Sequence, residues 1–75
     1  MQIYIKTLTG LILTFNFESS DTIETIKSII EDNRGIPVHQ QKIIFGGREV
    51  KNNETLFDLN VQPNSTVYLI LNIKG

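Results

Sequence analysis

The chain has 75 residues, no cysteine and one histidine, so it is short for a domain and has no disulfides. A fold of this size without disulfides or a metal must be held together by regular apolar packing. The net charge of −1 argues against the basic surface that binds nucleic acid or anionic lipid. No stretch reaches the about 20 apolar residues of a membrane span. We therefore expect one domain over residues 1–75, a monomer that binds neither nucleic acid nor membrane.

Residues 1–17 predict a β-hairpin. Apolar and polar side chains alternate over residues 1–7 and again over residues 13–17, which is the period of strands with one buried face. Thr9-Gly10 supplies a glycine-bearing turn between them, so the two strands should pair antiparallel. The expected inward side chains are Met1, Ile3, Ile5, Leu13, Phe15 and Phe17.

A helix is expected over residues 23–34. Isoleucines recur at helical spacing in this segment, Thr22 can cap its N-terminus, and Glu24 places a negative charge in the first turn. Gly35 can take the left-handed conformation that ends a helix, and Pro37 prevents continuation. The segment therefore carries both its start and its stop signals.

Three further extended segments follow the helix. Residues 41–45 and 48–50 flank a Gly46-Gly47 turn, and residues 66–72 form a last strand after an irregular loop. Two strands, one helix and then further strands predict an α+β fold in which a mixed sheet wraps around the helix. The last strand must lie beside the first to complete that sheet, which is the β-grasp arrangement.

The outer face of the sheet is expected to carry apolar side chains. The last strand is almost wholly apolar, yet only one of its two faces can meet the helix. If Val67 and the alternate residues up to Leu71 face inward, then Tyr68 and Ile70 point outward. Ile44 has the same outward phase on its own strand. Contiguous exposed aliphatic surface on a small domain usually marks a partner site.

Several stretches match those of a known family in register and without a gap. They are Met1-Gln2-Ile3, Lys6-Thr7-Leu8-Thr9-Gly10, Ser20-Asp21-Thr22-Ile23-Glu24, Gly35-Ile36-Pro37, Gln40-Gln41, Ile44-Phe45, Thr55-Leu56 and Ser65-Thr66. About half of all positions agree, and on these stretches the chain resembles ubiquitin over its whole length. Most substitutions at expected core positions stay apolar, so the resemblance implies the same β-grasp fold.

The resemblance implies two recognition surfaces. In ubiquitin, a main patch is read by ubiquitin-binding domains and by activating and conjugating enzymes. Its matching positions here are Leu8, Ile44 and Ile70, flanked by Gly47 and Tyr68. Tyr68 stands where ubiquitin has histidine, so a larger aromatic side chain replaces a pH-sensitive one. The second apolar surface would comprise Ile36, Leu71 and Ile73.

The resemblance also bears on covalent attachment. Ubiquitin is joined to targets through a tail that ends in two glycines, whereas this chain ends Asn72-Ile73-Lys74-Gly75. Gly75 would be the conjugation terminus, but one glycine is missing and Asn72 replaces an arginine that the activating enzyme reads. We therefore expect poor activation. The alternative is a given sequence that stops one residue short of the natural tail.

Most lysines on which ubiquitin builds chains are replaced. Lys6 and Lys27 remain as candidate acceptors. The replaced positions are Leu11, Ile29, Asn33, Arg48 and Pro63. Drift on a solvated face is an alternative to selection for chain termination. Lys27 falls on the inner side of the helix, so its stem should be buried and its role structural. Its ubiquitin counterpart pairs with an aspartate where this chain has Asn52.

These features predict a binding protein rather than an enzyme, because no catalytic constellation can be built from so few loop residues. His39 has no other histidine or cysteine with which to share a metal, so it should be solvent-exposed, and neither metal nor cofactor is expected. The leading interpretation is a ubiquitin-like protein recognised through its apolar patch, a mimic or decoy that forms ordinary chains poorly.

The alternatives are a covalent modifier joined to lysines through Gly75, and a ubiquitin-like domain of a longer protein. A modifier would act in the cytoplasm and nucleus. A mimic would be secreted or directed to a host cell.

Overall fold

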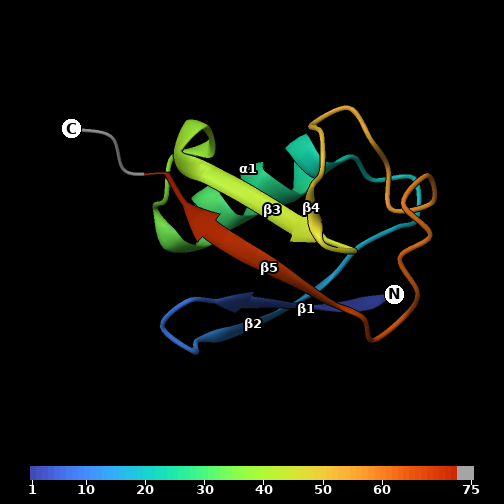
Figure 1. The fold of residues 1–75 in the computed structure, drawn as a ribbon, viewed down its shortest axis with the longest axis horizontal. Coiled ribbons are helices and arrows are strands. Elements are labelled where there is room, and N and C mark those ends of the chain that lie inside the picture. Colours follow the sequence, from blue (N-terminus) through green and yellow to red (C-terminus); the bar gives the residue numbers. More distant parts are fainter. Residues whose placement is uncertain (73–75) are drawn as a thin grey trace.

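The computed structural model describes residues 1–72, which form a five-stranded sheet with one helix against one face (Figure 1). The helix α1 spans Ile23–Arg34, and a short 3-10 helix η1 spans Val38–Gln40. The strands are β1 Gln2–Thr7, β2 Ile12–Asn16, β3 Gln41–Phe45, β4 Arg48–Glu49 and β5 Thr66–Leu71. This is the expected β-grasp α+β fold, a mixed sheet around one helix.

The strand order is β2-β1-β5-β3-β4, so β5 lies in the middle of the sheet beside β1 (Figure 1). β1 and β5 run parallel, with Tyr4 opposite Thr66 and Thr7 opposite Leu69. The other neighbouring strands are antiparallel. The prediction that the last strand completes the sheet beside the first is confirmed. β2 and β4 are left as the two edges.

The helix begins and ends where its local signals predicted. The Thr22 hydroxyl accepts a hydrogen bond from the Thr25 backbone N–H at 3.2 Å, which caps the N-terminus. Gly35 adopts a left-handed φ of 73°, and its N–H bonds the Glu31 carbonyl at 2.7 Å. A residue with a Cβ would be strained at this position.

The core lies between the inner face of the sheet and the helix. Alternate residues of β1 and β2 point inward as expected, although Met1 and Phe15 are only half-buried at its margin. The helix contributes one stripe of isoleucines, and the long loop before β5 closes one end. The buried apolar residues are Ile3, Ile5, Leu13, Phe17, Ile23, Ile26, Ile30, Ile43, Val50, Leu56, Val61, Val67 and Leu69.

The end of β5 differs from the prediction. The strand stops at Leu71 rather than Asn72, and Leu71 is 41% exposed instead of facing the core. Leu71 pairs with Gln41 at the first residue of β3, so it lies at the end of the sheet, beyond the buried core. It forms part of a surface hollow instead. None of the helices in residues 1–72 combines the length and apolar character needed to cross a bilayer.

Candidate recognition surface

The outer face of the sheet brings together side chains from three separate segments. Ile44 on β3 lies directly opposite Tyr68 on β5, and Tyr68 is in turn opposite Lys6 on β1. Ile70 lies two residues beyond Tyr68 on the same face. Leu8 follows Thr7, which pairs with Leu69, so Leu8 lies at the level of Ile70 just past the end of β1. Four of the predicted patch residues are therefore neighbours.

Exposure differs sharply within this patch. Leu8 is 82% exposed in the β1–β2 turn and Tyr68 is 49% exposed, whereas Ile44 and Ile70 are half-buried between their strand neighbours. Gly47 flanks the patch in the β3–β4 turn, where Gly46 and Gly47 have φ values of 64° and 80°. Two consecutive positive φ angles are typical of a tight hairpin turn. We define the recognition surface as Leu8, Ile44, Gly47, Tyr68 and Ile70. At its centre the aliphatic Ile44 lies opposite the aromatic Tyr68.

The second predicted surface adjoins the first. Ile36 and Leu71 line an apolar hollow together with Leu8 and Leu11, closed below by Leu69. Leu8 therefore belongs to both surfaces, a link that the sequence did not reveal. Two predicted residues, Ile73 and Gly75, lie outside the described residues.

Ile12 was missed by the sequence analysis. It is 56% exposed on β2 and lines a shallow groove with Tyr4, Lys6, Thr66 and Tyr68, which extends the recognition surface toward the sheet edge. The alternation in the sequence could have shown this, because Ile12 is two residues from the outward-facing Thr14 and so points to the same face. An apolar residue at an outward position of a hairpin strand indicates a possible contact surface.

The recognition surface lies on the part of the chain that matches a known family. A family profile described as "Ubiquitin family" matches residues 3–74. The chain belongs to the ubiquitin family. Members of this family are non-enzymatic protein modifiers, which supports the prediction that the chain is not an enzyme.

Relatives of this ubiquitin-family chain cover its whole length. It is 33% identical to "Ubiquitin-like protein NEDD8" of Dictyostelium discoideum over 75 residues, which are 100% of this chain and 97% of the relative. It is 36% identical to "NEDD8-like protein RUB3" of Arabidopsis thaliana, again over 100% of this chain and 96% of the relative. "NEDD8-like protein RUB1" of Saccharomyces cerevisiae is 32% identical, with 97% of its length covered. The chain is therefore related to NEDD8-like members of the ubiquitin family.

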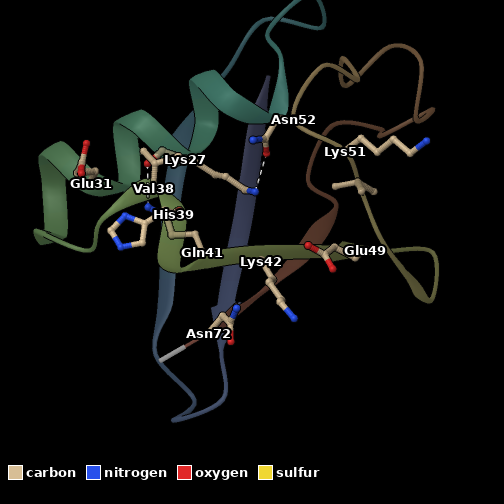
Figure 2. A pocket seen from close by; sticks show the side chains of 11 residues that line it. Lys27, Glu31, Val38, His39, Gln41, Lys42, Glu49, Lys51, Asn52 and Asn72 are labelled. Atoms are coloured by element: carbon tan, nitrogen blue, oxygen red, sulfur yellow. Dashed lines mark hydrogen bonds between the residues drawn. The ribbon is translucent and has the colours of Figure 1, made fainter. Parts of the chain in front are cut away.

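The two lysines that this chain shares with ubiquitin differ in accessibility. Lys6 is exposed on β1, while Lys27 is only 5% exposed, which confirms that its stem is buried. Figure 2 shows Lys27 reaching from α1 toward Asn52, and its Nζ donates a 2.6 Å hydrogen bond to the Asn52 Oδ1. Burial lowers the pKa of Lys27 from its ordinary value, and the charges of Glu49 and then Glu24 partly oppose this. Its contacts favour a structural role.

Gln41 ties the same side of the helix to the sheet. Its Nε2 donates to the carbonyls of Lys27 and Ile36, each at 2.9 Å, and the residue is buried. Its Oε1 is buried without a hydrogen-bond partner among residues 1–72. This side chain fixes the start of β3 against α1 and against the segment that carries Ile36, which belongs to the apolar hollow.

Arg48, the residue that replaces a ubiquitin lysine, is held in an ion pair. Its Nη1 and Nη2 donate to the two carboxylate oxygens of Glu54 at 3.2 and 3.0 Å. The Glu54 Oε1 also accepts the Lys51 backbone N–H at 2.7 Å. These hydrogen bonds, first that of Arg48 and then that of Lys51, lower the pKa of Glu54 to about 2, and the pair raises the pKa of Arg48. Arg48 thus borders the recognition surface beside Gly47 as a fixed cation.

His39 lies in η1 and is exposed, as predicted. In the described part of the chain no three His, Cys, Asp or Glu side chains come together in a way that could hold a metal ion.

Proposed function

We propose that this chain is a ubiquitin-like protein that activating and conjugating enzymes and ubiquitin-binding domains recognise through Leu8, Ile44, Gly47, Tyr68 and Ile70. The observation that carries the proposal is the direct pairing of Ile44 with Tyr68 on a sheet face that no other element of residues 1–72 covers, continued by the highly exposed Leu8. Apolar and aromatic side chains clustered on an open face are typical anchors of a protein interface.

Substitution of Ile44 tests this surface. We expect Ile44→Ala to weaken binding to ubiquitin-binding domains about tenfold or more, because a central aliphatic anchor is worth about 1.4 kcal/mol or more. Titration calorimetry against several such domains measures the effect. Phe57→Ala truncates an apolar side chain that is 77% exposed in the loop before β5, away from this surface, and is the matched control. Equal affinities of wild type and Ile44→Ala, with both chains folded, would remove the proposal.

Two fates are compatible with this recognition. Relationship to NEDD8-like proteins favours a covalent modifier joined to lysines. Asn72 and the loss of most ubiquitin acceptor lysines favour a mimic or decoy that occupies the same partners without forming ordinary chains. Formation of a thioester with an activating enzyme separates the two, because only a modifier needs to be charged.

A further inference from the structure

β2 is an edge strand of the sheet, and natural proteins usually protect such strands against pairing with another chain. The strand order leaves β2 and β4 at the two edges. β4 has two residues and begins with Arg48, which is paired with Glu54. β2 has five residues and pairs only with β1 among the strands of residues 1–72. A free edge offers unpaired backbone groups to another strand.

The hydrogen-bond phase of β2 follows from its two ends. The Phe17 N–H bonds the Met1 carbonyl at 2.8 Å while the Met1 ammonium donates to the Phe17 carbonyl, and the Thr7 N–H bonds the Leu11 carbonyl at 2.9 Å. In an antiparallel pair, residues alternate between bonding inward to the partner strand and pointing away from it. Residues 11, 13, 15 and 17 therefore bond β1, and Ile12, Thr14 and Asn16 direct their backbone N–H and C=O groups to the free edge.

These outward groups have no backbone partner elsewhere in residues 1–72. Ile12, Thr14 and Asn16 are all exposed. Residues 11–17 read Leu-Ile-Leu-Thr-Phe-Asn-Phe, with no charge, proline or glycine. Natural edge strands commonly carry a lysine, a proline or a bulge that prevents pairing. β2 has none of these, and its sequence strongly favours the extended conformation.

We propose that the free edge of β2 pairs antiparallel with β2 of a second copy of this chain. A two-fold axis at Thr14 places Thr14 opposite Thr14 of the second copy, and Ile12 opposite its Asn16. In this register every outward N–H and C=O of the three residues meets a complementary group. A shift by one residue loses the hydrogen-bond phase, and a shift by two leaves groups unpaired at both ends.

The charge pattern favours a second copy as the occupant. An isologous interface brings each patch against itself, so any charge near its axis would repel its own copy. No charged residue lies between Leu11 and Phe17, and these two residues would themselves stand opposite each other across the axis. The partly exposed Leu11 would then lie at the level of Phe17 of the second copy, whose side chain is buried in its own core.

The association should be weak. Pairing two five-residue strands by their edges buries less than the about 1,200 Å² of a stable interface. Dimers should therefore form in the high micromolar to millimolar range and dissociate on dilution. The length and composition of the chain favour a monomer at low concentration. At high concentration, the edge position of β2 favours a dimer. The dimer would leave β3 and β5 free, so it would present two recognition surfaces at once.

Substitution at the axis tests the pairing by sedimentation velocity and by amide chemical shifts at increasing concentration. Wild type should show rising apparent mass, with shifts concentrated at Ile12, Thr14 and Asn16. Thr14→Lys and Thr14→Glu should each weaken association at least tenfold, because like charges would meet at the axis. An equimolar mixture of the two variants should recover it. Thr66→Lys, the same change in the middle of the sheet, should behave as wild type.

Any of three outcomes would overturn the proposal. The wild type could stay monomeric at about 1 mM, the Thr14 variants could associate as the wild type does, or the mixture could fail to recover association. Concentration-dependent shifts centred on Ile44 and Ile70 would assign the contact to the recognition surface instead. If Thr14→Lys loses its dispersed amide spectrum, the double change Ile12→Lys with Asn16→Lys places like charges opposite each other on both sides of the axis and gives the same test.

Discussion

At the scale of single residues, Lys27 is a buried cation whose hydrogen-bond acceptor carries no charge. The residue is only 5% exposed, and its ammonium donates to the neutral amide of the exposed Asn52. A buried charge is costly unless an opposite charge accompanies it. Glu49 and Glu24 act only through longer-range attraction, and burial still outweighs them, since the pKa of Lys27 is lowered. The amide therefore fills the position of a counter-ion without providing its charge.

Asn52→Asp should stabilise the fold by about 1 kcal/mol, because a hydrogen bond between two charged groups is stronger than one to a neutral amide. The denaturant midpoint should rise at unchanged slope. Asn53→Asp adds the same charge to the neighbouring exposed residue and should change the midpoint little. A midpoint for Asn52→Asp at or below that of wild type would mean that Glu49 and Glu24 already serve the lysine.

Glu54 makes stability depend on acid pH. Its pKa is lowered from 4.5 to about 2 in the folded chain, so the unfolded chain binds its proton first as pH falls. The stability that Glu54 contributes is complete above a pH of about 4.5 and is lost as the pH falls toward 2. Because the pair is on the surface, the effect should be small. Glu54→Gln should flatten the fall of Tm over this range, measured by calorimetry at several pH values. Arg48→Gln removes the first cause of the lowered pKa of Glu54 and should flatten the fall as well.

At the scale of elements, the helix shows how local signals act together. Thr22 caps its first turn, Gly35 ends it, and Gln41 fastens its middle to β3 through the Lys27 carbonyl. The Thr22 backbone also bridges to Thr55 in the long loop, so the cap lies where the helix meets that loop. Loss of the cap should therefore affect the whole fold rather than one helix end.

Thr22→Ala should destabilise the fold by about 1 kcal/mol, since the Thr25 N–H would lose its side-chain acceptor. Chemical denaturation followed by circular dichroism measures this. Thr22→Ser keeps a hydroxyl at the same position and should lie close to wild type. Equal destabilisation by alanine and serine would show that the threonine methyl group, and not the cap, is responsible.

At the scale of the whole molecule, the sheet order assembles the surfaces on which function depends. Leu8, Ile44 and Tyr68 lie on three segments that are far apart in the chain, and they meet because β5 lies between β1 and β3. The same order holds the start of the tail in place, since the Asn72 N–H bonds the Gln40 carbonyl at 2.7 Å. Asn72 is therefore presented from the rigid end of the sheet.

Asn72→Arg combined with one glycine appended after Gly75 should raise the rate of thioester formation with a ubiquitin-activating enzyme about tenfold or more. The resemblance to ubiquitin implies that the activating enzyme reads an arginine at this position, and replacing it by a neutral amide should cost about 1.4 kcal/mol or more. Single-turnover charging followed on non-reducing gels gives the rate. Asn33→Arg with the same appended glycine, the same change at an exposed residue of α1, is the control. A wild-type chain that forms the thioester about as fast as ubiquitin does would favour the covalent-modifier fate over the mimic.

The sequence by itself determined the elements and most of the core. Helix bounds, the hairpin and the inward residues of β1 and β2 depend on a cap, a turn or a period of two, and each of these signals spans a few neighbouring residues. The resemblance to ubiquitin indicated the recognition surface, whose residues the structure brings together while their role stays a prediction.

Only the tertiary structure decided which segments become neighbours. The contact between Lys27 and Asn52 joins residues 25 apart in the chain. The exposure of Leu71, the sharing of Leu8 between two apolar surfaces and the free edge of β2 all follow from the strand order. No local pattern encodes that order, because the strands are selected by burial of a common core and by backbone pairing across long loops.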